Sequence, residues 1–218
     1  MLELGAGNGR ITKILAACAK EVVAVDIVPE MLELARRQLA GATNVSFMLA
    51  DMRTVRLKRR FDLIVAANDP LSHLLEARER CRALATVAAH LQQQVQEQGV
   101  FVMDAHWFSE KAEARASKGV TRERRLGPAD SALRIRRFCQ CDPATQTVEE
   151  RVEYQPQGEP AVVVTTRLHY WKPERLRDEF ARSGLRVSDW WGGYKNEPFE
   201  QRTSAHLVVR AVLSSPIT

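Results

Sequence analysis

The sequence predicts an α/β fold in which helices cover both faces of a doubly wound, mostly parallel sheet. Short apolar runs that are typical of buried strands alternate with segments of helical periodicity through the first half of the chain. A glycine-rich turn at residues 5–9 joins the first of these runs to the first helical segment. With 218 residues the chain is long enough for one well-buried core, so we expect a single domain overall.

The first half of the chain is expected to alternate strands and helices up to residue 103. Pro29 suits the first turn of the second helix, and Gly41 suits its end. Leu84, Ala88, Leu91 and Val95 share one stripe of the third helix, whose other face is rich in Arg, Glu and Gln. The expected strands are residues 2–4, 22–25, 45–49, 61–66 and 100–103, and the expected helices are residues 11–20, 29–40 and 74–98.

An inserted antiparallel β subdomain is expected after the fifth strand. Residues 109–132 are polar and helix-permissive, with a break at Gly127-Pro128. Asp142-Pro143 is a turn signal between the first two of the strand-like segments that follow. The expected strands of the insert are residues 133–141, 147–154 and 161–171.

The chain is expected to return to the core sheet after the insert. Pro173 opens a helix, and two further strands follow at residues 187–191 and 206–213. No helical crossover separates these two strands, so we expect them to pair antiparallel. We therefore divide the single domain into a ligand-binding core, an insert with a substrate or dimer role, and the end of the core sheet, at residues 1–108, 109–171 and 172–218.

The composition and charge exclude several classes of protein. No apolar run approaches the ~18 residues that a membrane span needs, and no secretory signal pattern is visible. The four cysteines lack C-x-x-C spacing, and no histidine lies close in sequence to Cys139 and Cys141 to complete a metal site. We therefore expect a reduced, cytoplasmic protein with no membrane partner and no metal.

Two basic clusters, at residues 56–60 and 122–125, raise the question of a phosphate-bearing partner, because the net charge is +5. Neither cluster is interleaved with stacking aromatic residues. We interpret both as solvated surface and do not expect a nucleic acid as partner.

The glycine-rich turn predicts a nucleoside-containing ligand. Gly5 and Gly7 let the backbone turn tightly and approach a ligand, and Asp26 follows at the end of the second strand, where a ribose diol could donate to it. A dinucleotide site would require a third glycine at the position of Arg10, and no G-x-x-x-x-G-K-[ST] loop is present. The pattern therefore favours a nucleoside with a substituent other than a phosphate.

The motifs together resemble the class I S-adenosylmethionine-dependent methyltransferase family. The resemblance covers nearly the whole chain and implies a Rossmann-like sheet of seven strands with an antiparallel last strand. Residues 68–74 and the inserted strands resemble the small-molecule branch, near the glycine and amino-sugar N-methyltransferases. The residues that carry the resemblance are Glu3-x-Gly5-x-Gly7-x-Gly9, Asp26, Asp51-Met52 and Phe61-Asp62-Leu63-Ile64.

The resemblance implies S-adenosyl-L-methionine as cofactor, S-adenosylhomocysteine as product, and a role for eight residues. Gly5 and Gly7 would leave room for the methionine moiety, and Asp26 would bind both ribose hydroxyls. Glu3 would orient the ammonium group of the cofactor or brace the loop. The other four would contact adenine or the transferred methyl: Ile27 on one adenine face, Asp51 at the adenine amino group, Met52 against the ring and Asn68 beside the methionine portion.

Transfer of a sulfonium methyl requires that the nucleophile be aligned and desolvated. When the acceptor arrives protonated, a base that removes its proton helps the reaction. The candidate bases at the carboxyl edge of the sheet are Asp69, His73 and His106. Aromatic faces could hold a cationic acceptor, and the candidates for that role are Tyr170, Trp191 and Tyr194.

The leading interpretation is a methyltransferase that acts on a nitrogen or oxygen of a small molecule. An RNA or protein methyltransferase on the same fold is an alternative, although Asn68-Asp69-Pro70 lacks the second proline and the aromatic residue of the N-P-P-[YFW] loop. A non-catalytic cofactor-binding or dimerising module is another. It is motivated by the N-terminal helix that covers the cofactor in relatives and that this sequence lacks, and by edge strands of the insert that could pair in a homodimer.

Overall fold

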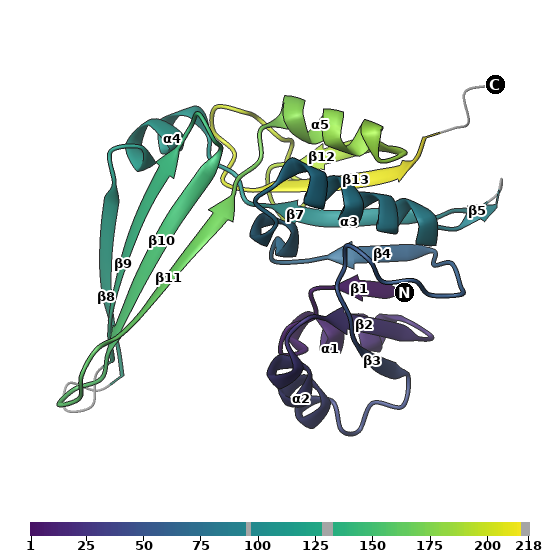
Figure 1. The fold of residues 1–218 in the computed structure, drawn as a ribbon, viewed down its shortest axis with the longest axis horizontal. Coiled ribbons are helices and arrows are strands. Elements are labelled where there is room, and N and C mark those ends of the chain that lie inside the picture. Colours follow the sequence, from purple (N-terminus) through teal and green to yellow (C-terminus); the bar gives the residue numbers. More distant parts are fainter. Residues whose placement is uncertain (95–96, 128–132, 215–218) are drawn as a thin grey trace.

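The computed structural model describes residues 1–94, 97–127 and 133–214. Its centre is a seven-stranded sheet with the order β12-β13-β7-β4-β1-β2-β3 (Figure 1). β13 pairs antiparallel with both β7 and β12, whereas the pairs among the remaining strands are parallel. The strands are β1 (Leu2–Leu4), β2 (Val22–Asp26), β3 (Val45–Leu49), β4 (Leu63–Ala66), β7 (Val100–Ala105), β12 (Leu185–Trp191) and β13 (Leu207–Leu213).

This sheet confirms the predicted Rossmann-like α/β fold with an antiparallel last strand. The central strands are apolar on both faces, as the continuous run of β2 indicates, because helices cover the sheet on each side. The helices are α1 (Arg10–Cys18), α2 (Pro29–Gln38), α3 (Ala77–His90) and α5 (Pro173–Arg182), with a 3-10 turn, η1 (Pro70–His73), before α3.

The two ends of the sheet are held by different helices. α1 and α2 contact β2 and β3, and α5 packs on α3 and β12 (Figure 1). A buried ion pair of 2.7 Å between Arg80 of α3 and Glu179 of α5 joins the second pair of helices, and the Arg80 guanidinium lies 5.3 Å from the ring centroid of Trp171. Trp171 is fully buried in the main core, so this junction fixes the end of the insert to the sheet.

The insert is a separate four-stranded antiparallel sheet that extends away from the core, with the short helix α4 (Glu110–Ala116) beside it (Figure 1). Its strands are β8 (Val120–Leu126), β9 (Leu133–Asp142), β10 (Thr147–Gln155) and β11 (Val162–His169), in the order β11-β10-β9-β8. Tyr170 and Val148 lie in a small second core at the base of this sheet.

Two sequence predictions about these elements were wrong. The helix expected to reach residue 98 ends at His90, and two short strands, β5 (Gln93–Gln94) and β6 (Glu97–Gln98), follow it. Gln and Glu favour helices and Val95 follows Leu91 at helical spacing, yet the helix ends because the backbone after it pairs with Phe61, whose carbonyl accepts a hydrogen bond of 3.0 Å from the N–H of Gln92. In its described part, residues 109–127, the helix-permissive segment forms α4 and then a fourth insert strand, β8, because β9 offers it a partner. The predicted break at Gly127-Pro128 lies partly outside the described residues.

Neither a membrane span nor a metal cluster appears in the described part of the chain. None of its helices is long and apolar enough to cross a membrane. No group of three His, Cys, Asp or Glu side chains is arranged there to hold a metal ion. Cys139 and Cys141 are free thiols.

Candidate functional site

The glycine turn lies at the point where the order of the parallel strands reverses. β1 pairs with β2 on one side and with β4 on the other, so the loops after β1 and β4 open a crevice at the carboxyl edge. Gly5 has a φ of +75°, and a Cβ at this position would lie 2.4 Å from the Cβ of Pro70. Glycine is therefore required where the first loop meets η1.

Asp26 ties the glycine turn to the end of β2. Its Oδ2 accepts a hydrogen bond of 2.7 Å from the N–H of Gly7, and its Oδ1 accepts one of 2.9 Å from the N–H of Val28. Each carboxylate oxygen can accept a second hydrogen bond, and Asp26 lines the crevice. The carboxylate is thus fixed by two backbone groups while it retains capacity for a diol.

The crevice holds a cavity of about 530 Å³, which we call the cofactor cavity. This volume lies within the range of small-molecule sites. All eight residues predicted to contact a cofactor line it, and the candidate base His73 lies at its edge on η1. These eight are Glu3, Gly5, Gly7, Asp26, Ile27, Asp51, Met52 and Asn68.

Glu3 is buried beneath the glycine turn. Only 2% of its surface is exposed, and Thr12 of α1 donates a hydrogen bond of 2.6 Å to its Oε2. Burial raises the pKa of Glu3 to about 7, because the charged form loses its hydration. The side chain therefore braces α1 against the first loop, and it lines the cofactor cavity as well.

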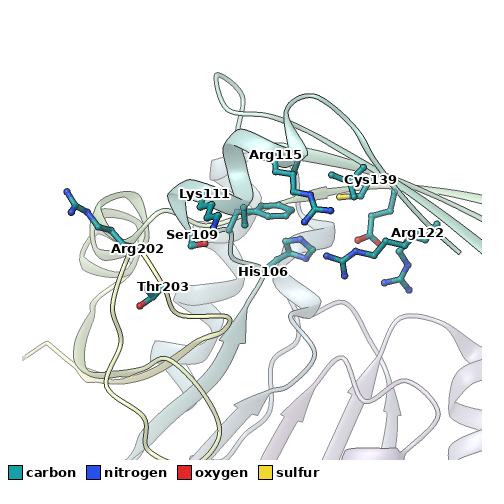
Figure 2. Close-up of a pocket in the computed structure, with 14 residues that line it drawn as sticks. His106, Ser109, Lys111, Arg115, Arg122, Cys139, Arg202 and Thr203 are labelled. Carbon is teal, nitrogen blue, oxygen red and sulfur yellow. The ribbon is translucent and has the colours of Figure 1, made fainter. Parts of the chain in front are cut away.

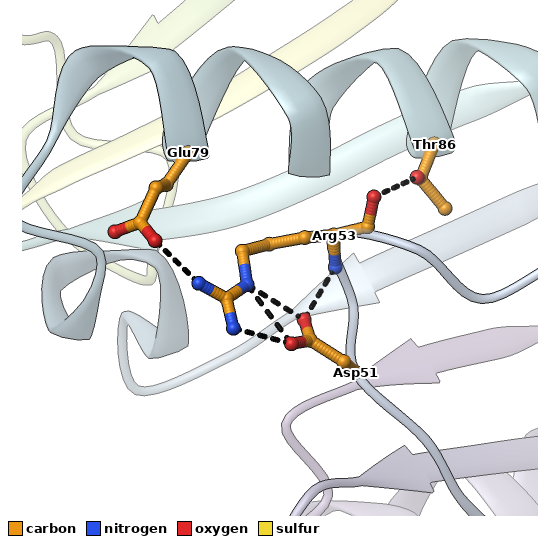
Figure 3. Close-up of polar contacts among 4 residues, drawn as sticks. All are labelled: Asp51, Arg53, Glu79 and Thr86. Carbon is orange, nitrogen blue, oxygen red and sulfur yellow. Dashed lines mark hydrogen bonds and ion pairs between the residues drawn. The ribbon is translucent and has the colours of Figure 1, made fainter.

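Asp51 is held by an arginine that the sequence analysis did not single out. Arg53 donates from Nε to both Asp51 oxygens and from Nη2 to Oδ2, and its Nη1 donates to Glu79 of α3 (Figure 3). The hydrogen bonds from Arg53 hold the pKa of Asp51 below its usual range. The arginine fork fixes the orientation of a carboxylate that stands at the cavity edge.

The loop after β4 is strained at two consecutive residues. Asn68 and Asp69 have positive φ values of 59° and 48°. Asp104 of β7 accepts a hydrogen bond of 2.7 Å from the N–H of Asn68 and one of 3.2 Å from the hydroxyl of Tyr194. Arg10 donates to the Asn68 side-chain oxygen at 2.9 Å. The loop is thus held in an unfavourable conformation by partners from two other segments, α1 and β7.

Asp69 and His106 meet behind this loop. The backbone N–H of His106 donates to Asp69 Oδ2, while Asp69 Oδ1 is buried with no partner among the described residues. Burial raises the pKa of Asp69 to about 7. Burial also lowers the pKa of His106, so its imidazole is neutral at neutral pH and can accept a proton.

A chain of cavities leads from the glycine turn to the insert. A cavity of about 270 Å³, the connecting cavity, shares Asn68 with the cofactor cavity. It shares His106 with a third cavity of about 590 Å³ beneath the insert sheet, which we call the insert cavity (Figure 2). Asn68 and His106 thus stand at the two ends of this row of neighbouring cavities, and we call the connecting cavity between them the passage.

The three aromatic candidates for acceptor binding lie in different surroundings. Tyr194 is 66% exposed and lines none of the three cavities that the described residues form, although its hydroxyl donates to Asp104, which lines the connecting cavity. Tyr170 is fully buried in the core of the insert, where its hydroxyl donates to Glu113, so its ring has no exposed face. Trp191, at the end of β12, lines none of the three cavities as far as the described residues show.

The sequence analysis missed the groups that join these candidates. Asp104 and Arg10 hold the loop that carries Asn68, and Arg53 holds Asp51. Asp104 could have been recognised as a polar residue near the end of a buried strand. Arg10 and Arg53 follow site residues closely in sequence, yet only the fold shows that their side chains turn back onto the site.

Comparisons with known proteins agree with this fold. Residues 1–94 match the family model of a methyltransferase domain. Nodulation protein S of Sinorhizobium fredii is 32% identical over 66 residues, which are 30% of this chain and 31% of that protein. The chain therefore matches less than a third of the length of this curated relative.

Two solved structures superpose over 98% of the chain. One is an S-adenosylmethionine-dependent methyltransferase from Clostridium acetobutylicum, with a TM-score of 0.80, 18% identity and 83% of that chain covered. The other is CalS10, an amino pentose methyltransferase from Micromonospora echinaspora with S-adenosylmethionine bound, with a TM-score of 0.76, 20% identity and 82% covered. The chain has the fold of these methyltransferases, and its first 94 residues match a methyltransferase domain.

Proposed function

We propose that this chain, which has a methyltransferase domain, transfers a methyl group from S-adenosyl-L-methionine to a nitrogen or oxygen of a small molecule. The observation that supports the proposal is the passage between Asn68 and His106, which lies between the cofactor cavity and the insert cavity and shares one lining residue with each. A methyl donor on one side and an acceptor on the other would meet in this passage.

The residues around the cofactor cavity fit the chemistry of the cofactor. Asp26, held by two backbone N–H groups, has free acceptor capacity for the ribose diol. Gly7 adds no side chain to the turn, and an added Cβ there would meet nothing within 4 Å, so the space beside it is open. Ile27 is 58% exposed, which leaves an apolar surface for an adenine ring to cover.

Bound S-adenosylmethionine would supply an electrophilic methyl on a positively charged sulfur. The protein has to position a nucleophile in line with it and keep water away. Neutral His106 is the group best placed to take the proton of the acceptor, because it lines both the connecting and the insert cavities. Asp69 accepts a hydrogen bond from the backbone N–H of His106, and His73 lines the cofactor cavity.

The basic cluster at residues 56–60 does not favour a nucleic-acid substrate. Arg59 pairs with Glu21 at 2.6 Å, and Arg56 and Arg60 donate to backbone carbonyls of the chain itself. These side chains brace the loop before β4, which leaves fewer cations for a phosphate backbone. Their pairing supports a small molecule rather than RNA as acceptor.

Calorimetry with S-adenosylhomocysteine tests the cofactor assignment. We expect binding to the wild-type chain, a loss of at least tenfold in affinity for Asp26→Ala, and unchanged affinity for Asp62→Ala, which removes an exposed carboxylate at the opposite end of a strand. Equal affinities for all three proteins would refute the assignment. Methyl transfer to a panel of amines and phenols then separates an enzyme from a binding module.

A further inference from the structure

The insert cavity carries a strong excess of positive charge. It is formed by α4, the strands β8 to β10 and the loop before β13 (Figure 2). The described residues that line it include a single carboxylate, Glu150, and five cationic side chains: Lys111, Arg115, Arg122, Arg137 and Arg202. Figure 2 shows Arg115 and Arg122 extending from two different elements toward the space above His106.

The strand register places two of these arginines against each other. Arg122 of β8 lies directly opposite Arg137 of β9. Like charges at directly opposed positions destabilise a sheet, so a structural role would favour an acid at one of them. Neither of these arginines, nor Arg115, makes an ion pair or a side-chain hydrogen bond with any residue in the described ranges. Three guanidinium groups at one cavity therefore keep their donors available.

The other face of the same strands shows the opposite arrangement. Successive strand residues alternate between faces, so Glu123 and Arg136 lie on the face away from the cavity. Glu123 accepts two hydrogen bonds of 2.9 Å from Arg134, and Arg136 lies 3.7 Å from Glu123 and 3.8 Å from Glu153. The outer arginines are matched with glutamates, whereas the inner ones have no such partner.

We propose that the insert cavity binds an anionic small-molecule acceptor, whose phosphate or carboxylate is held by Arg115, Arg122 and Arg137 while its nucleophile lies at His106. This inference rests on the proposed function and names the chemical class of its acceptor. Guanidinium groups suit this role, because their planar forks bind phosphate and carboxylate oxygens in pairs. The cavity of about 590 Å³ has the size of a small-molecule site.

The remaining lining agrees with an anion that is bound at one end only. Phe108, Ala112 and Ala116 form an apolar wall beside the arginines. Burial raises the pKa of the Cys139 thiol to about 11, so this side chain adds no negative charge near the guanidinium groups. His106 is shared with the connecting cavity, so an acceptor anchored at the arginines would extend toward the methyl donor.

The test measures the binding of inorganic pyrophosphate and of succinate to the full chain by calorimetry at low salt. We expect at least one of them to bind, with about a tenfold loss of affinity for Arg122→Gln and again for Arg137→Gln. Arg136→Gln is the matched control, because it removes the same charge from the same strand on the opposite face. Its affinity for the anion should equal that of the wild type. Pyrophosphate binding without succinate binding identifies a phosphate acceptor, and the reverse identifies a carboxylate.

Three results would overturn the inference. The first is that neither anion binds, and the second is that Arg136→Gln and Arg122→Gln lose the same amount of affinity for the anion. The third is that single-stranded RNA binds in a way that depends on these arginines while the small anions do not bind. S-adenosylhomocysteine affinity is measured on the same proteins. If it is absent while pyrophosphate binding still depends on Arg122, the proposed function fails and the anion site stands. If it is intact while the anions do not bind, the inference alone fails.

Discussion

Asp69 accepts a hydrogen bond from the backbone N–H of His106, and this contact ties the strained loop after β4 to the end of β7. The carboxylate is 6% exposed, and its other oxygen has no partner among the described residues. One buried carboxyl group therefore positions both ends of the passage, since the loop carries Asn68 and the strand end carries His106. Its ionisation should affect stability and the site together.

Asp69→Asn should flatten the dependence of folding stability on pH. The pKa of Asp69 is about 7 in the folded protein, whereas an unfolded aspartate has a pKa of about 3.9. The folded state therefore holds the proton more tightly, so the stabilisation from this group is complete below pH ~4 and is lost as the pH rises through 7. We expect the variant to lose less stability than the wild type between pH 4.5 and 7.5, by on the order of 2 kcal/mol.

Urea unfolding at a series of pH values measures this difference. The pKa of Glu3 is also raised in the folded protein. The free energy of unfolding of Asp69→Asn should therefore still decrease with pH, and this dependence should weaken further when Glu3→Gln is added. A slope in the single variant equal to that of the wild type would contradict the assignment of a protonated Asp69.

Arg53→Ala should weaken cofactor binding, because Arg53 lines the cofactor cavity and holds Asp51 there. Without the arginine fork, Asp51 loses its fixed orientation and α3 loses its contact through Glu79. The pair is partly exposed, so we expect a loss of about 1 kcal/mol, or about fivefold in S-adenosylhomocysteine affinity. Arg59→Ala removes a comparable surface pair with Glu21 and serves as the control. Equal affinities for Arg53→Ala and Arg59→Ala would show that the clamp on Asp51 has no role in binding.

Gly5→Ala should destabilise the fold through a clash with Pro70. The added Cβ would lie 2.4 Å from the proline Cβ, and the φ of +75° is unfavourable for alanine. We expect a loss of about 3 kcal/mol in the free energy of unfolding, from overpacking and backbone strain combined. Gly41→Ala is the matched control, because nothing lies within 4 Å of a Cβ there. Thermal unfolding that is equal for the two variants would refute the clash.

The sequence was sufficient to predict the core sheet and the lining of the cofactor cavity. Strand ends in a parallel sheet meet at one edge, so Gly5, Asp26, Asp51 and Asn68 could be brought together from local patterns alone. Each pattern consists of a short strand and a residue at its carboxyl end or at most two positions beyond it, so it can be recognised within a few residues of sequence.

The insert was predicted less well, because its structure depends on pairing between distant segments. Residues 120–126 contain four charged side chains and have no strand periodicity of their own, and they become β8 through their register with β9. The cluster at residues 122–125 was interpreted as solvated surface. In the structure Arg122 lies on the cavity face opposite Arg137, whereas Glu123 lies on the outer face with Arg134. Adjacent residues thus have different surroundings, which composition cannot reveal.

His106→Gln should reduce methyl transfer far more than it reduces cofactor binding. We expect kcat for a protonated acceptor to fall by about 100-fold or more, because the base is removed, while S-adenosylhomocysteine affinity is retained because His106 does not line the cofactor cavity. Burial lowers the pKa of His106, so the acid limb of the wild-type pH–rate profile should lie below the value of about 6.5 for a free imidazole. This limb should be absent in His106→Gln. If the limb persists in His106→Gln and disappears in His73→Gln, the histidine on the cofactor side is the base, and His106 only lines the passage.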